Sequence, residues 1–345
     1  MELTNVLYDG LRAAIGLEAV VYALAAIGLN IHFGYTGLLN FGQVGFMLLG
    51  AYGVAITARP CADVAATQTA AEQIGPCGQP LALGVLVGIG LAVVLALLLG
   101  VPTLRLRADY LAITTIAAGE ILRFVFRSDS AQALTNSVFG IQQFAGDIYA
   151  INPIPDGRYF GQLNFSERQL WVMVLGWGLV ALLCAWTWLL MRSPWGRVLK
   201  SIREDEDAAR ALGKNVFSYK MQALVLGGVF GALGGIFLAM GTQAVNPDTY
   251  IPIRTFFAYV IIILGGTGTI LGPVVGTFLF LFLTAGLETL MRELITGGVI
   301  SEAVIGLPEV GPIRFIMVGL MLALLMAFRP QGLLGNREEM LLDAR

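Results

Sequence analysis

The sequence predicts an all-α membrane protein, a polytopic bundle of about nine transmembrane helices (eight to ten) that forms a single domain over residues 1–345. Three observations predict this fold class. Hydrophobic residues make up 57% of the chain and charged residues only 13%, whereas soluble proteins carry about a quarter charged residues. Apolar runs recur along the chain at close to the roughly 20 residues that a bilayer crossing needs. One polar segment between two of these runs has the pattern of a surface helix.

The apolar runs and the basic residues between them predict the topology. Of the 21 Lys and Arg residues, 12 fall on the side that carries Arg192–Lys220, and eight are spread over longer loops on the other side. Cytoplasmic loops carry an excess of Lys and Arg, so the first side is predicted to be cytoplasmic and the N-terminus to lie outside. The nine predicted spans are Leu11–Ile31, Leu38–Ala58, Leu81–Val101, Tyr110–Phe126, Leu170–Met191, Met221–Met240, Phe256–Leu271, Pro273–Leu294 and Ile313–Phe328.

The polar segment Arg192–Lys220 is predicted to hold one helix, from Pro194 to Leu212. Ser193 suits the N-cap, Pro194 the first helical position, and Gly213 a left-handed stop after the last turn. Apolar residues three or four positions apart share one face, and charged residues populate the rest. The apolar face consists of Trp195, Val198, Leu199, Ile202, Ala209 and Leu212. Such a helix is either a solvated loop helix on its own protein or a docking surface for a partner.

The second run is rich in glycine and carries two amides, Asn40 and Gln43. Small residues let helices approach closely in lipid, and a broken helix is tolerated at membrane depth where it lines a cavity. A buried amide needs partners, so Asn40 and Gln43 are candidates for a translocation path. The lone histidine, His32, is predicted to be interfacial, and without a second histidine no histidine-based metal site is expected.

The fourth run places Glu120 and Arg123 three positions apart, with Thr114 and Thr115 one or two turns earlier. A carboxylate within a span should face protein or water. Helical spacing favours a local ion pair between Glu120 and Arg123. The alternative is a polar step in a permeation path, for which Thr114, Thr115 and Glu120 are candidates.

Two further carboxylates within spans, Glu18 and Glu288, have no evident partner in the sequence. Cys61 and Cys77 fall in a predicted outer loop and form a candidate disulfide, which spacing alone cannot establish. Cys184 lies inside a span and is expected to be a small core residue.

Glycine motifs in the second half of the chain predict packing and turning, and they do not predict nucleotide binding. Gly227, Gly231 and Gly235 recur every four residues, as in closely packed helices. The stretch ILGGTGTILGPVVG must turn tightly, but Leu271 stands where a dinucleotide fingerprint needs its third glycine. No phosphate-binding loop occurs elsewhere, so no cofactor is expected on this chain and the chain is not expected to be an enzyme. A net charge of −2 gives no general attraction to nucleic acid.

Five blocks carry a resemblance to a known family. They are GYTGLLNFGQVGFMLLGAY, ADYLAITTIAAGEILRFV, SPWGRVLKSIREDEDAARALGKNVFSYK, ILGGTGTILGPVVG and FRPQGLLG. In this order, over nearly the whole chain, they resemble the integral-membrane permease subunits of bacterial branched-chain amino acid ABC importers. The resemblance implies a multi-pass protein of the bacterial plasma (inner) membrane. It also implies four kinds of contact: a second homologous permease, two ATP-binding subunits, an extracytoplasmic solute-binding protein and the lipid bilayer.

The resemblance further implies that Gly196–Lys220 is the cytoplasmic coupling segment that docks on an ATPase subunit. The residues expected to couple are Gly196, Arg197, Arg203, Asp205, Asp207, Ala209 and Gly213. One departure concerns Leu134–Ile141, which reads LTNSVFGI where relatives often carry a double glycine. The departure leaves the solute open.

Two other function classes remain as alternatives. A permease of a related importer for urea or amides would have the same blocks, because specificity in this family rests largely on the binding protein. A stand-alone secondary transporter would have the same spans but would gain from an inverted repeat, which is not evident. The sequence also leaves open whether the permease pair is a homodimer or a heterodimer.

Overall fold

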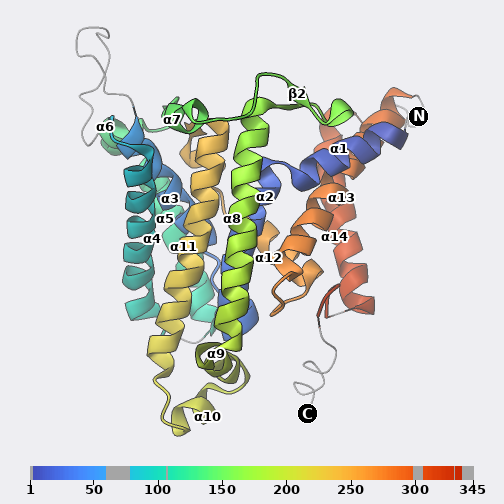
Figure 1. Ribbon diagram of the computed structural model, residues 1–345. Helices are drawn as coiled ribbons and strands as arrows, with labels where there is room; N and C mark the ends of the chain where they lie inside the picture. Colours follow the sequence, from blue (N-terminus) through green and yellow to red (C-terminus); the bar gives the residue numbers. More distant parts are fainter. Residues whose placement is uncertain (1–2, 60–77, 106–107, 298–305, 330, 336–345) are drawn as a thin grey trace.

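The computed structural model describes residues 3–59, 78–105, 108–297, 306–329 and 331–335, and within them the chain is mostly helical. The long helices stand side by side between two ends of the molecule (Figure 1). We call the end that carries α1, α6 and α7 the outer end, and the end that carries α9 and α10 the inner end. The helices in chain order are α1 (Leu3–Ile15), α2 (Leu17–Leu29), the π-helix η1 (Asn30–Tyr35), α3 (Gln43–Ala58), α4 (Leu81–Thr103), α5 (Ala108–Arg127), α6 (Gln132–Thr135), α7 (Gly146–Ala150), α8 (Glu167–Arg192), α9 (Pro194–Glu204), α10 (Glu206–Ala211), α11 (Val216–Thr242), α12 (Ile253–Gly265), α13 (Gly272–Thr296) and α14 (Val310–Phe328).

Short elements complete the chain, mainly at the outer end. Strand β1 pairs antiparallel with β4, and β2 pairs antiparallel with β3. The strands are β1 (Ile141–Gln142), β2 (Arg158–Tyr159), β3 (Phe165–Ser166) and β4 (Ala244–Val245), and the 3-10 turns are η2 (Asp129–Ala131), η3 (Gly161–Leu163), η4 (Pro247–Thr249) and η5 (Leu307–Glu309). The β1–β4 pair ties the segment between α5 and α8 to the end of α11.

Each predicted apolar run overlaps a helix of the structure. Among the described residues, six helices are long and apolar enough to cross a membrane, and two shorter apolar stretches are Gln43–Ala58 and Val310–Leu320. The chain is therefore a multi-pass membrane protein, while the number nine stays a prediction. The predicted candidate disulfide of Cys61 and Cys77 lies outside the described residues.

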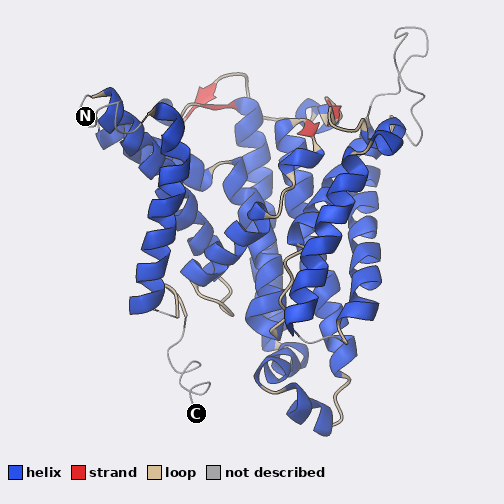
Figure 2. Ribbon diagram, turned by 180° about the vertical axis from the view of Figure 1, so that it is seen from behind, coloured by secondary structure: helices blue, strands red, loops and turns tan. Residues whose placement is uncertain are grey.

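The two ends agree with the predicted distribution of loops between the two sides. Helix α1 and the segment 128–168 lie at the outer end, whereas α9 and α10 lie at the opposite end (Figures 1 and 2). The N-terminal helix thus shares a side with the predicted outside loop. Which end faces the cytoplasm stays a prediction from the Lys and Arg bias.

Helices α2, α3 and α11 form the packed centre of the bundle. A Cβ on Gly28 would lie 2.3 Å from the Gly227 carbonyl oxygen, and a Cβ on Gly235 would lie 1.9 Å from the Met47 carbonyl oxygen. Such backbone approaches allow only glycine, because a side-chain carbon cannot sit that close to a carbonyl oxygen. The predicted packing role of Gly227, Gly231 and Gly235 is confirmed.

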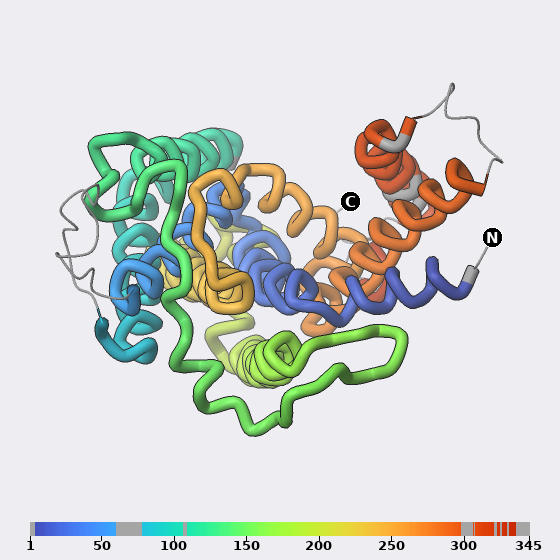
Figure 3. Tube along the Cα trace, turned by 90° about the horizontal axis from the view of Figure 1, so that it is seen from above, coloured from blue at the N-terminus to red at the C-terminus, as the bar shows by residue number. Residues whose placement is uncertain are grey.

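Helices α1, α13 and α14 form an arm beside the bundle. Seen from above, α1 extends along the outer end toward α13 and away from the other helices (Figure 3). The predicted first run, Leu11–Ile31, is therefore divided: α1 ends before Gly16, and α2 starts at Leu17 in a new direction.

The chain between α2 and α3 is not a regular helix. The first run continues as the π-helix η1, Gly37 takes a left-handed backbone with φ of 73°, and α3 begins only at Gln43. Leu38 N–H donates to the His32 carbonyl at 2.8 Å, which folds the chain back on η1. The glycines of the second run left a broken helix open as an alternative to close packing, and the structure has an irregular segment over residues 37–42, before a continuous α3.

The predicted glycine turn follows α12 and is closed by the end of the described chain. Gly266 and Gly268 have φ values of 114° and 71°, which favour glycine. Leu333 N–H and Leu334 N–H donate to the carbonyls of Leu264 and Gly265, both at 3.0 Å. Residues 331–335 therefore satisfy carbonyl groups that the end of α12 would otherwise leave open.

Candidate functional site

A buried polar centre lies where η1, α3 and α11 meet. His32, Asn40 and Gln43 each have no exposed surface in this chain. His32 Nε2 lies 3.1 Å from the Leu224 carbonyl oxygen and therefore donates, which leaves Nδ1 to accept from Asn40 Nδ2 at 3.1 Å. The prediction that His32 is interfacial is wrong, because the chain continues past it as η1 inside the bundle.

Gln43 connects this centre to α11. Its Nε2 donates to the Gly227 carbonyl at 2.9 Å, and its Oε1 accepts from Asn40 Nδ2 at 3.3 Å. A Cβ on Gly231 would lie 2.5 Å from Gln43 Nε2. The glycine stripe of α11 therefore leaves room for a polar side chain as well as for close helix packing.

Two threonines from other helices satisfy backbone groups at the start of α3. Thr115 of α5 accepts a hydrogen bond from Phe41 N–H at 3.0 Å, and Thr255 of α12 accepts one from Val44 N–H at 3.0 Å. Helix starts leave such N–H groups without a partner in their own helix. Thr115 is fully buried, so it acts here as a brace for α3.

The predicted path residues thus divide into two sets. Asn40, Gln43 and Thr115 are buried, whereas Thr114 and Glu120 are half-buried on another flank of α5. Thr114 Oγ1 donates within its own helix to the Tyr110 carbonyl at 2.7 Å. No contact of the structure tests a path, and its assignment to these five residues stays a prediction.

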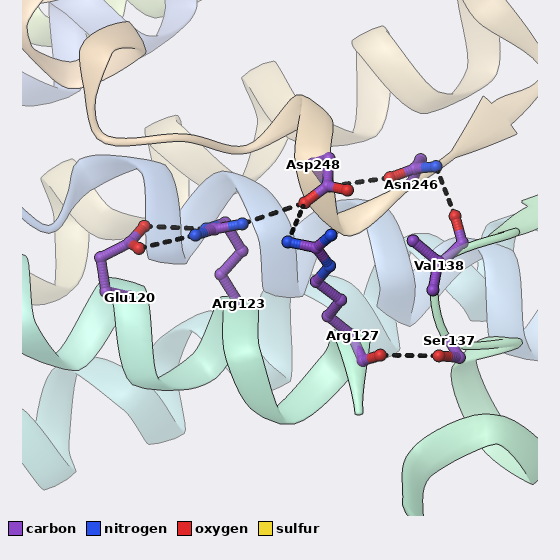
Figure 4. Close-up of polar contacts among 7 residues, drawn as sticks. All are labelled: Glu120, Arg123, Arg127, Ser137, Val138, Asn246 and Asp248. Carbon is purple, nitrogen blue, oxygen red and sulfur yellow. Dashed lines mark hydrogen bonds and ion pairs between the residues drawn. The ribbon is translucent and has the colours of Figure 1, made fainter. Parts of the chain in front are cut away.

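Glu120 belongs to a cluster of four ionisable side chains near the outer end of α5, which we call the outer charge cluster: Glu120, Arg123, Arg127 and Asp248 (Figure 4). Arg123 donates to Glu120 through Nε at 2.9 Å and through Nη2 at 2.8 Å, which confirms the predicted ion pair. Arg123 Nη1 also donates to Asp248 at 3.0 Å, and Arg127 Nη1 lies 3.4 Å from the same carboxylate. Asp248 was not predicted, because it lies 125 residues from Arg123 in sequence.

The position of Asp248 depends on the outer loops. Asn246 Oδ1 accepts from Asp248 N–H at 2.8 Å, and Asn246 Nδ2 donates to the Val138 carbonyl at 2.7 Å (Figure 4). Val138 lies in Leu134–Ile141, the segment that departs from the family pattern. The departing segment is therefore bound to the loop that carries Asp248.

The coupling segment forms two helices where the sequence predicts one. Asp205 has an extended backbone with φ of −152°, and its Oδ1 accepts from Asp207 N–H and Ala208 N–H, both at 2.9 Å. The aspartate therefore ends α9 and caps α10, since a short carboxylate competes for nearby backbone donors. Ser193 is the N-cap residue of α9, as predicted, but its side chain does not cap the helix, because Ser193 Oγ donates to the Leu190 carbonyl of α8 at 2.6 Å.

Two predicted terminal signals are confirmed. Pro194 occupies the start of α9, and Gly213 is left-handed with φ of 77°. Leu212 is 79% exposed, although the sequence placed it on the apolar face. The break at Asp205 resets the helical rotation, so the periodicity of α9 does not extend into α10.

The other predicted coupling residues lie on both faces of the segment. Gly196 is buried, and a Cβ there would lie 2.5 Å from the Met191 Cα and carbonyl oxygen. Ala209 is buried in a small apolar cluster with Ile202 and Val216. The exposed members are Arg197, Asp205, Asp207 and Gly213.

Arg203 reaches from α9 into the bundle. Its Nη1 donates to the Gly34 carbonyl of η1 at 2.6 Å. A Cβ on Gly268 would lie 3.0 Å from the same nitrogen, and a Cβ on Gly37 would lie 3.5 Å from Arg203 Cγ. The guanidinium therefore lies between the end of η1 and the glycine turn after α12.

Asn30 joins these two segments from the other side. Its Nδ2 donates to the Thr269 carbonyl at 2.8 Å, and its Oδ1 accepts from Gly268 N–H at 2.9 Å. The helix η1 is thus hydrogen-bonded to α9 through Arg203 and to the glycine turn through Asn30, and it also carries His32 of the buried polar centre.

A charged groove of about 850 Å³ lies at the inner end between α10 and the end of α4. Glu206 pairs there with Lys220 and with Arg210, whose Nη2 is 2.9 Å away. Arg210 Nη1 also donates to Asp207 at 2.8 Å. The surface next to the coupling segment therefore presents both signs of charge.

The remaining carboxylates within spans have partners on the side of the arm. Glu18 pairs with Arg254 at 3.0 Å, and both side chains line a cavity of about 630 Å³ between the arm and the bundle. Glu288 pairs with Arg292 at 2.9 Å and with Arg314. The prediction that the sequence offers Glu288 no partner is wrong, because Arg292 lies four positions further along α13, at the spacing of a helical ion pair. The predicted Cys184 core position is confirmed, and the described residues contain no cluster of side chains that could hold a metal ion.

Comparison with known proteins identifies the family. The family model described as "Branched-chain amino acid transport system / permease component" matches residues 12–326. The high-affinity branched-chain amino acid transport system permease protein LivM of Salmonella typhimurium is 28% identical over 338 residues, which cover 93% of this chain and 69% of LivM. LivM of Escherichia coli is 27% identical over 91% of this chain and 68% of its own length.

A third relative is similar over nearly its whole length. The probable branched-chain amino acid transport permease protein LivM of Methanocaldococcus jannaschii is 25% identical, covering 92% of this chain and 91% of the relative. No solved structure matches the chain. Because the family model spans the buried polar centre, the outer charge cluster and the coupling segment alike, the chain belongs to the family of permease components of branched-chain amino acid transport systems.

Proposed function

We propose that the chain is the permease subunit of an ABC importer for branched-chain or related neutral amino acids in the bacterial plasma (inner) membrane. Its partners would be a second homologous permease, two ATP-binding subunits and an extracytoplasmic solute-binding protein. The observation that carries the proposal is the polar helix pair α9–α10, held at one end of a membrane bundle that matches the family model over residues 12–326. The chain supplies the path, and the ATP-binding subunits supply hydrolysis.

The exposed side of α9–α10 is the proposed docking surface for an ATP-binding subunit. Arg197 and Asp207 are exposed there, and Leu212 adds an exposed apolar side chain beside the left-handed Gly213. The neighbouring charged groove contains both signs of charge, which suits a partner with complementary charge. Buried Gly196 and Ala209 support this surface from below.

Arg203 is the proposed positioning residue that carries a movement of α9 into the bundle. Its short, charge-assisted hydrogen bond to the Gly34 carbonyl links α9 to η1, and η1 carries His32 of the buried polar centre. A contact of this kind transmits a change only if its free energy differs between the two states of the complex. We infer that the link is intact in one state and strained or broken in the other.

The flank of α5 is the proposed location of the path, shared with the second permease. Thr114 and Glu120 place polar groups on this flank beside exposed apolar side chains such as Ile113 and Ile121. Polar residues at membrane depth usually face protein interiors or water-filled routes. Asn40, Gln43 and Thr115 would set the position of α5 from behind.

Reconstitution of the complete complex in proteoliposomes tests this function. With ATP inside and loaded binding protein outside, radiolabelled leucine should accumulate, and complexes without the ATP-binding subunits should show no uptake. Uptake of leucine by the permease pair alone, driven by an ion gradient, would instead establish a secondary transporter. Uptake of urea or an amide in place of leucine by the ATP-driven complex would establish the related importer.

A further inference from the structure

The outer charge cluster consists of two ion pairs that differ in hydrogen bonding and in exposure to solvent. Glu120 and Arg123 are joined by two hydrogen bonds, and the Arg123 side chain is only 11% exposed. Arg127 and Asp248 are joined by one ion pair of 3.4 Å, and their side chains are 44% and 41% exposed. An exposed ion pair contributes little to stability, so Arg127 can exchange Asp248 for another carboxylate at low cost.

The cluster contains two carboxylates and two guanidinium groups, so its formal charge is zero. A ligand with one carboxylate and one ammonium group can enter such a cluster by exchanging ion pairs, without leaving a net charge near the membrane. The ligand carboxylate would accept from Arg127, for which a two-pronged guanidinium contact is favourable. The ligand ammonium would donate to Asp248, whose other guanidinium contact, with Arg123 at 3.0 Å, remains.

Apolar surface adjoins the charges. The Phe124 ring lies under Arg123, with 4.6 Å between the guanidinium carbon and the ring centroid, and Phe124 is 57% exposed. Phe124 is three positions before Arg127 on α5, which places the two side chains on neighbouring parts of the helix surface. A ligand whose charged groups meet Arg127 and Asp248 can thus place an aliphatic side chain on this surface.

We propose that the outer charge cluster is a transient binding site for a zwitterionic α-amino acid with an apolar side chain, at the outer mouth of the path. The inference rests on the proposed function and adds to it a site and a selection rule. Urea and neutral amides lack the two charges that the ion-pair exchange needs, so the cluster favours amino acids over them. The competing account is that the four residues only fasten η4 to α5.

The test measures leucine uptake by the complete complex in proteoliposomes over a range of concentrations of loaded binding protein. Arg127→Gln removes the open guanidinium, and Arg127→Lys keeps a positive charge at that position. Arg168→Gln is the matched control, because Arg168 is another arginine of the outer end with a 70% exposed side chain and an ion pair of only 3.9 Å. Assembly and thermal stability of each complex are measured in parallel.

We expect Arg127→Gln to lower the maximal uptake rate roughly tenfold, which matches the loss of one charged hydrogen bond. The half-saturating concentration of binding protein should not change, Arg127→Lys should recover part of the rate, and Arg168→Gln should behave like the unmodified complex. An unchanged maximal rate, with or without lower thermal stability, would show that the cluster is only a fastening. A change confined to the half-saturating concentration would show that Arg127 belongs to the docking surface of the binding protein, and this too would overturn the inference.

These outcomes are separable from the proposed function. If the unmodified complex does not transport leucine with ATP, the proposed function itself fails. If it does and Arg127→Gln does as well at the full rate, only the binding site is refuted.

Discussion

Replacing Arg203 with glutamine tests how the coupling segment communicates with the bundle. The change removes a donor that lies 2.6 Å from the Gly34 carbonyl and leaves that carbonyl without its side-chain partner. Hydrogen bonds from charged donors contribute about 1.5–3 kcal/mol. A loss of this size corresponds to roughly a 10- to 150-fold change in the equilibrium between linked and unlinked arrangements of α9 and η1. Gly37 lies close to the arginine stem and Gly268 close to its Nη1. The shorter glutamine side chain therefore cannot reach the Gly34 carbonyl by moving within this space.

The assay measures leucine transported per ATP hydrolysed, together with the affinity of the ATP-binding subunits for the permease pair. Arg203→Gln should lower the transport ratio at least tenfold, by the lower bound of that range, and leave the affinity unchanged. Arg210→Gln is the control, because Arg210 is 60% exposed and pairs only with residues of its own helix among the contacts described. Arg210→Gln should weaken the binding of the ATP-binding subunits and leave the leucine transported per ATP hydrolysed by the docked complex unchanged. If Arg203→Gln weakens docking and preserves the ratio, Arg203 belongs to the docking surface and the proposed link is refuted.

Three further predictions concern stability and topology. Gly235→Ala should destabilise the protein by about 1–3 kcal/mol or more, because the new carbon would meet a backbone carbonyl 1.9 Å away; Gly178→Ala, with nothing within 4 Å, should leave the unfolding temperature in detergent nearly unchanged, and equal effects of the two would contradict the packing argument. Asp205→Ala should cost the α10 turn about 1 kcal/mol by removing its cap, seen as faster hydrogen exchange over residues 206–211, whereas Asp205→Asn should exchange like the original; no difference between the two would argue against the cap. In intact cells that express a chain with its native cysteines replaced, an impermeant thiol reagent should label Asp156→Cys and not Asn215→Cys; labelling of the latter would reverse the orientation.

Features that depend on nearby residues could be predicted from the sequence. The four-residue spacing of Gly227, Gly231 and Gly235 is a property of one helix, and so is the ion pair of Glu120 with Arg123. Pro194 and Gly213 mark their helix ends because each constrains its own backbone. The family resemblance was confirmed for the same reason: it depends on ordered local blocks.

Features that depend on the tertiary arrangement could not be predicted. Arg254 lies 236 residues from Glu18, and no spacing rule reaches that far. His32 was misplaced because hydropathy marks where a run becomes polar, and a polar ring can still be buried when a carbonyl and an amide meet both its nitrogens. The break at Asp205 was missed because the apolar period continues by coincidence to Ala209. This residue is buried in the observed pair of helices, as it would be in the single predicted helix.

For the candidate site, the sequence identified polar side chains that need partners but not the function of each side chain. Asn40, Gln43 and Thr115 were selected because polar groups in lipid need partners, and they have them: each other, His32 and the backbone of α3 and α11. The same reasoning cannot tell a brace from a path, since both satisfy the polar group. Only exposure separates Thr114 and Glu120 from the buried three.

The hydrogen bonds that close α12 also determine when this fold can be completed during synthesis. Leu264 and Gly265 receive their partners from Leu333 and Leu334, which leave the ribosome after every described helix of the chain. At a translation rate of about 5–20 residues per second, roughly 3 to 14 s pass between the synthesis of Leu264 and that of Leu333. Throughout that interval the end of α12 lacks these two backbone partners, so this part of the inner end is completed only after α14, the last helix that the structure describes, has been made. A nascent chain that stalls before Leu333 would therefore be distinguishable, by its open α12 terminus, from one that has been fully made.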